Sequence, residues 1–123
     1  LEAGEEDFRR RERKALQQVI KKDNILVSTG GGAPCHRNNM TLMEKNGIVI
    51  YLKADDEILV SRLKPAALDR PIVKGKSEEE LRIFLAELRN RCEHYYRRAH
   101  FIVDGNKSAM NDIIKQLKNA KAI

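Results

Sequence analysis

Three successive glycines, Gly30, Gly31 and Gly32, form the strongest chemical signal in the sequence. Because they lack Cβ atoms, their backbone N–H groups can approach the oxygen atoms of a ligand directly. The triplet follows a short apolar segment that is predicted to be a strand, and ligands of open α/β sheets bind at the carboxyl ends of the strands. A turn with positive φ angles is the alternative, although a single glycine usually serves that purpose. The triplet therefore predicts a ligand-binding turn.

A charged pair near the start of the chain is the second signal. Arg9 and Glu12 are three residues apart in a stretch with helical periodicity, so they share one helix face and can form an ion pair. A guanidinium that is held in this way presents two parallel donors to a carboxylate or a phosphate. An exposed helix start with mixed charges is the alternative interpretation.

Basic residues gather between positions 62 and 76, where two prolines interrupt the helical pattern. A basic loop above a crevice is typical of the lid of a phosphoryl-transfer enzyme, and a surface loop with ordinary lysines is the alternative. Arg91 is a further candidate site residue, because its helix is expected to end near the third predicted strand and so to bring arginines toward the crevice. The basic residues of the loop are Arg62, Lys64, Arg70, Lys74 and Lys76.

Several other kinds of site are excluded by spacing. None of the seven glycines forms the GxxxxGK[ST] pattern of a phosphate loop, and GxGxxG fails because Cys35 stands at the position of its third glycine. No residues have metal-ligand or catalytic-triad spacing. Cys35 and Cys92 are single and widely separated, so we expect no disulfide framework, a reducing cytoplasm and no need for either thiol in catalysis.

Helices and short strands alternate along the chain, which predicts βαβ units and a parallel sheet in an α/β fold. The predicted helices cover residues 6–22, 36–44, 55 or 56 to 63, 77–96 and 108–117, and the predicted strands cover residues 25–28, 48–52 and 101–103. Ser77 and Glu80 form a capping box at the start of the long helix. Three strands are few for a sheet that is covered on both faces, so we expect an incomplete fold within one domain, residues 1–123.

Composition narrows the class of protein. Hydrophobic residues make up 41% and charged residues 34% of the chain, as in a globular domain with a charged surface. No apolar run approaches the roughly 20 residues of a membrane span, and we expect no signal peptide. The net charge of +6 allows nucleic acid as a partner, but only 5% of residues are aromatic, so few side chains can stack on bases.

Four motifs, taken in order, resemble the shikimate kinase family over roughly the C-terminal two-thirds of such an enzyme. They are GExxFRxxE at Gly4 to Glu12, GGG at Gly30 to Gly32, RP at Arg70-Pro71 and RxxxY at Arg91 to Tyr95. The resemblance implies a P-loop kinase fold with three layers, here incomplete with three strands. It also implies transfer of the ATP γ-phosphate to the 3-hydroxyl of shikimate, on the pathway to chorismate and the aromatic amino acids.

The resemblance implies roles for individual residues at the shikimate end of the site. Arg9, oriented by Glu12, would bind the shikimate carboxylate, and Arg91 would be the second residue of this clamp. Gly31 and Gly32, supported by Gly30, would hold the substrate through backbone contacts.

On the ATP side, Arg70 in a lid of residues 64–76 would reach the transferring phosphate and act as the catalytic residue. Arg62 matches the family's adenine-side arginine loosely, because its distance to Arg70 is one residue longer. Residues 106–110 lack the proline that often packs on the adenine.

The phosphate loop and the Mg²⁺ ligands of the family would precede Leu1, and we expect the metal to have no ligand within this chain. We expect a monomeric cytoplasmic enzyme that acts on shikimate and Mg-ATP and binds neither nucleic acid nor membrane. Two alternatives are open: a basic nucleic-acid-binding module, and a non-catalytic relic of a P-loop kinase. The reading frame upstream of Leu1 distinguishes the kinase from these alternatives, because a GxxxxGK[ST] segment about 50 residues back indicates a kinase and a start codon at or just before Leu1 contradicts it.

Overall fold

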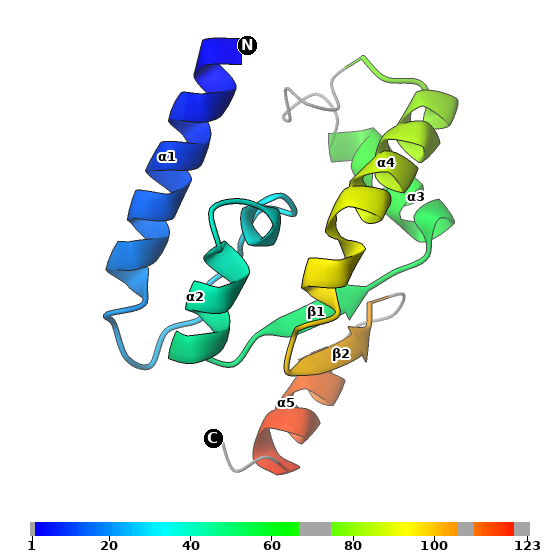
Figure 1. The fold of residues 1–123 in the computed structure, drawn as a ribbon. Helices are drawn as coiled ribbons and strands as arrows, with labels where there is room; N and C mark the ends of the chain where they lie inside the picture. The colour runs from blue at the N-terminus through cyan, green and yellow to red at the C-terminus, as the bar shows by residue number, and fades with distance from the viewer. Residues whose placement is uncertain (1, 67–74, 106–109, 120–123) are drawn as a thin grey trace. The chain divides into compact units, whose positions relative to one another are not determined.

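The computed structural model describes residues 2–66, 75–105 and 110–119 of the chain (Figure 1). Helices and a parallel sheet alternate within these ranges, which confirms the α/β class. In chain order the elements are α1 (Glu2–Val19), the 3₁₀ helix η1 (Ala33–Cys35), α2 (Asn39–Asn46), β1 (Ile50–Lys53), α3 (Asp56–Ala66), α4 (Glu78–Tyr96), β2 (Phe101–Asp104) and α5 (Met110–Asn119).

These elements divide into two compact units, which are described separately. The first unit is Leu1–Val49 with Cys92–His100, and the second is Ile50–Arg91 with Phe101–Ile123, so that α4 runs from the second unit into the first. That residues 1–123 form a single domain stays a prediction.

The first unit contains α1, η1, α2 and the last turn of α4. Leu16 of α1, Met40 of α2 and Cys92 of α4 are buried, as their apolar types require. The predicted helix from residue 36 begins instead at Asn39, because Arg37 and Asn38 have φ angles of 52° and 58° and a right-handed helix cannot pass through them. It ends at Asn46, two residues beyond the predicted end.

The second unit contains a parallel pair of strands that run side by side (Figure 1). Ile50 of β1 pairs with Phe101 of β2, and the register continues to Lys53 and Asp104. A separate apolar cluster joins α3 to α4, where Val60, Leu81 and Leu85 are buried.

The capping box at the start of α4 is confirmed. The Glu80 backbone N–H donates to Ser77 Oγ at 3.2 Å, and the Ser77 backbone N–H donates to the Glu80 carboxylate at 3.0 Å. Two unpaired N–H groups of the helix start are satisfied in this way, so α4 begins where the sequence predicts it.

Two sequence predictions about the elements are wrong. The described residues contain two strands rather than three, because Ile25 to Ser28 has no neighbouring strand to pair with, and Leu26 is 90% exposed. The proline at position 65 does not end α3, which continues to Ala66, since a proline in the last turn removes only one helical hydrogen bond. No helix among the described residues is both long and apolar enough to cross a membrane.

Candidate functional site

The glycine triplet and the Arg9 side chain meet in the first unit. A Cβ atom placed on Gly32 would lie 2.7 Å from Arg9 Nη2, 3.0 Å from Nη1 and 3.2 Å from Cζ. Gly32 has an ordinary φ of −83°, and of the described glycines only Gly75 has a positive φ. The alternative interpretation of the triplet as a positive-φ turn is therefore wrong. The Arg9 guanidinium occupies the place that a side chain on Gly32 would take.

Two carboxylates fix the orientation of this guanidinium. Arg9 Nη1 donates to the Glu12 carboxylate at 2.9 Å, which is the pair predicted from the sequence, and Nε donates to Glu5 at 2.9 Å. The side chains of Arg9 and Glu12 are only 15% and 16% exposed. Neither carboxylate takes Nη2, the nitrogen nearest to Gly32. A cationic donor is thus presented at the glycine turn.

The ion pairs also keep Arg9 charged. Burial lowers the pKa of Arg9, but the hydrogen bonds to Glu12 and Glu5 outweigh it, so the pKa lies above its ordinary value. The hydrogen bond from Arg9 in turn lowers the pKa of Glu5. Glu5 belongs to the GExxFRxxE motif, but its pairing with Arg9 was not predicted, although the spacing of four residues is the signal that could have found it.

The carbonyl groups of the glycine triplet are all engaged within the protein. Gly30 O accepts from the Ala33 backbone N–H and Gly32 O accepts from the Cys35 backbone N–H, both at 3.1 Å. Gly31 O accepts from the Tyr96 hydroxyl of α4. Because these bonds fix the carbonyl oxygens, the peptide planes of the turn have defined orientations, and the turn can offer N–H groups to a ligand.

A buried asparagine joins the same turn to the two helices beside it. Asn39, which is 0% exposed, donates from Nδ2 to Ala33 O at 2.8 Å. Its Oδ1 accepts from Arg13 Nη1 of α1 at 3.0 Å. Both ends of the amide are satisfied, as burial requires, so Asn39 ties η1 to α1. Neither Asn39 nor Tyr96 was identified from the sequence, because nothing in the spacing marks them.

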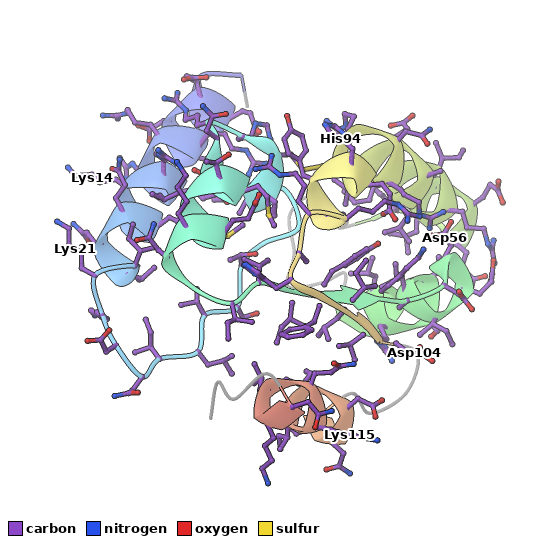
Figure 2. The ribbon with its side chains drawn as sticks, turned by 60° about the horizontal axis from the view of Figure 1, so that its bottom comes forward. Lys14, Lys21, Asp56, His94, Asp104 and Lys115 are labelled. Carbon is purple, nitrogen blue, oxygen red and sulfur yellow. A yellow bond between two sulfur atoms is a disulfide. The ribbon has the colours of Figure 1, made fainter. Side chains whose placement is uncertain are left out.

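The two cysteines are joined in the structure, contrary to the sequence prediction. Cys35 of η1 and Cys92 of α4 form a disulfide with Cα atoms 5.6 Å apart (Figure 2). A single pair that is 57 residues apart has no recognisable spacing, so only the fold shows that the two thiols meet. Cys92 is 2% exposed, so its sulfur lies in the core of the first unit.

The other predicted site residues lie in the second unit or outside the described residues. Arg62 on α3 and Arg91 on α4 are exposed residues of the second unit. Arg70 and most of the predicted lid, residues 67–74, lie outside the described residues. His94 is exposed and its ring lies 4.0 Å from that of Tyr95 (Figure 2), and His100 Nδ1 accepts from the Val49 backbone N–H.

Comparison with known proteins gives consistent matches to one family. Residues 1–121 match the family described as shikimate kinase. The chain is 45% identical to the shikimate kinase of Azobacteroides pseudotrichonymphae over 93% of its length and 68% of the relative's. It is 40% identical to that of Parabacteroides distasonis over 97% of its length and 69% of the relative's.

A solved structure agrees with these matches. The crystal structure of shikimate kinase from Bacteroides thetaiotaomicron superposes with a TM-score of 0.87 at 31% identity. The match covers 99% of this chain and 72% of that protein. The fold of the described chain is therefore that of part of a shikimate kinase, and the chain spans about two-thirds of the relatives' length.

Proposed function

The chain belongs to the shikimate kinase family, and we propose on that premise that it supplies the shikimate-binding part of an ATP-dependent kinase that phosphorylates the 3-hydroxyl of shikimate. The observation that carries the proposal is the Arg9 guanidinium, held by Glu12 and Glu5 against Gly32. Shikimate carries one carboxylate and several hydroxyl groups. A fixed guanidinium beside backbone N–H groups is suited to such a molecule.

In this proposal Arg9 Nη2 donates to the shikimate carboxylate, and the backbone of Gly31 and Gly32 contacts the ring substituents. Arg91 is proposed on the family resemblance as the second carboxylate-binding residue. Arg70 in the lid is proposed to neutralise the transferring phosphate, and Arg62 is proposed to lie toward the adenine. The role of these residues is positioning and charge neutralisation, which is what phosphoryl transfer requires of a protein.

Among the described residues, no group of three or more His, Cys, Asp or Glu side chains is placed to hold a metal ion, and the sequence lacks GxxxxGK[ST]. We propose that the Mg²⁺ ligands and the phosphate loop come from outside these 123 residues, in a cytoplasmic kinase of the longer family length. In this proposal the chain itself binds and orients shikimate, and its lid contributes Arg70 at the transferring phosphate.

The test uses an extended chain, in which the N-terminal segment of the Bacteroides thetaiotaomicron enzyme precedes residues 1–123. We expect shikimate-dependent formation of ADP from ATP. Arg9→Ala is expected to weaken shikimate binding about 10- to 150-fold and to spare ATP binding, because a charge-assisted hydrogen bond contributes about 1.5–3 kcal/mol.

The matched control is Arg10→Ala, since the neighbouring Arg10 pairs with Asp7 and its side chain is 69% exposed. Its shikimate affinity should stay within about twofold of the parent. Unchanged affinity in Arg9→Ala would remove Arg9 from the site. An extended chain that folds, binds no shikimate and forms no ADP would favour the relic, and tight binding of nucleic acid at physiological salt would favour the basic module.

A further inference from the structure

The glycine turn is restrained from α4 at two neighbouring points. Cys35, three residues after Gly32, is bonded to Cys92, and the Gly31 carbonyl accepts from Tyr96, four residues further along α4. Residues four apart share a helix face. One face of α4 therefore holds the turn covalently at Cys35 and by a hydrogen bond at Gly31.

The two restraints also meet at one oxygen atom. Cys35 Sγ lies 3.9 Å from Gly31 O, the same oxygen that accepts from the Tyr96 hydroxyl. In the disulfide this sulfur carries no hydrogen. As a thiol it gains a weak S–H donor within reach of Gly31 O, which has a second lone pair beside the one that accepts from Tyr96. Reduction thus removes the covalent restraint on the turn and leaves only hydrogen bonds to hold it.

We propose that Cys35 and Cys92 form a redox-modification site, whose disulfide holds the glycine turn in order and whose reduction by a dithiol weakens shikimate binding. The part that concerns shikimate rests on the proposed function. A lasting structural disulfide is rare in a reducing compartment, where those that form are transient or redox-sensing. A pair placed at a substrate turn fits that second class.

The exchange chemistry follows from the exposure of the two sulfurs. Cys92 is 2% exposed whereas Cys35 is only partly buried, so the entering thiolate attacks Cys35 Sγ. The S–S bond breaks, and Cys92 leaves as a thiolate that takes up a proton. The second thiol of the dithiol then attacks the mixed disulfide and releases Cys35 as a thiol. The protein gains two electrons and two protons, and the dithiol becomes a disulfide.

The test compares the extended chain after oxidation with glutathione disulfide and after reduction with dithiothreitol. Thiol titration should find no free thiol at Cys35 and Cys92 after oxidation and two free thiols after reduction. The KM for shikimate should rise about fivefold or more on reduction, while the KM for ATP stays the same, because only the ordering of the shikimate turn changes. Cys35→Ser and Cys92→Ser should show the higher KM under both conditions.

Equal KM values for shikimate in the two states, or two free thiols after oxidation, would overturn the proposal. Hydrogen exchange of the Gly30 to Cys35 backbone is a readout that needs no activity, and it should be faster in the reduced protein. If the extended chain is inactive in both states, the proposed function fails. The restraint that the disulfide places on the glycine turn is then judged by hydrogen exchange alone, and equal exchange rates in the oxidised and reduced protein reject it.

Discussion

Replacing Gly32 with alanine tests the central contact of the site directly. The new Cβ would lie 2.7 Å from Arg9 Nη2, whereas ordinary contact begins at 3.4 Å, so the guanidinium must move by about 0.7 Å. The φ of −83° at Gly32 suits alanine, so the backbone can stay where it is. The strain therefore falls on the flexible end of the Arg9 side chain.

The size of the effect follows from hydrogen-bond geometry. A charge-assisted bond of about 2.8 Å that lengthens by 0.7 Å reaches about 3.5 Å, where it contributes little. Loss of about 1.5–3 kcal/mol lowers the affinity for shikimate about 10- to 150-fold. Protein stability should not fall with it. Alanine at an ordinary φ restricts the unfolded chain and can stabilise the fold by about 0.4–1 kcal/mol.

The assay is equilibrium titration of the extended chain with shikimate, beside urea unfolding of the same protein. Gly30→Ala is the matched control, because a Cβ on Gly30 meets nothing within 4 Å. We expect weak binding with unchanged or greater stability for Gly32→Ala, and binding close to the parent for Gly30→Ala. Shikimate affinity within twofold of the parent in Gly32→Ala would refute the assignment of this contact to the substrate site.

Two further predictions concern other parts of the chain. Arg70→Ala should lower the turnover of the extended chain much more than its shikimate affinity, because the contact of Arg70 with the transferring phosphate strengthens as charge shifts in the transition state. Steady-state kinetics is the measurement, and a turnover within about twofold of the parent would reject this role. The hydrogen bond from Arg82 lowers the pKa of Glu57. This pair therefore stabilises the fold at pH values above 4.5, the ordinary pKa of the carboxyl group, and the stabilisation is lost as the pH falls through the lowered pKa. In urea unfolding between pH 6 and 3, Arg82→Ala should lose less stability on acidification than the parent, and equal losses would contradict the pairing.

Local patterns predicted the parts of the structure that depend on neighbours in the sequence. The pairing of Arg9 with Glu12 follows from a spacing of three residues on a helix, and the cap of α4 follows from Ser77 and Glu80 in the same way. Each of these interactions closes within one helical turn. Their geometry is therefore set before any tertiary contact forms.

Contacts between distant segments were beyond such patterns. Cys35 and Cys92 are far apart in the chain, and Tyr96 reaches Gly31 across 65 residues. The left-handed backbone at Arg37 and Asn38 was also not predicted from the sequence. The glycine turn is supported by these long-range restraints, and for that reason the sequence singled out its glycines but not the residues that support them.

The third strand shows what residue types can and cannot specify. Ile25, Leu26 and Val27 have the apolar character of a buried strand, yet all three are exposed within the described chain, as are Ile48 and Leu52. A strand forms only beside another strand, because its backbone N–H and C=O groups need hydrogen-bond partners there. Residue types supply only a preference for the extended backbone. In the longer chain proposed above, we expect further strands and helices to cover these exposed apolar residues in each unit. A phosphate loop in a P-loop kinase fold joins a buried strand to the helix that follows it. The segment that would complete the sheet is therefore also the one expected to bring the phosphate site. Folding and catalysis would then both depend on that segment.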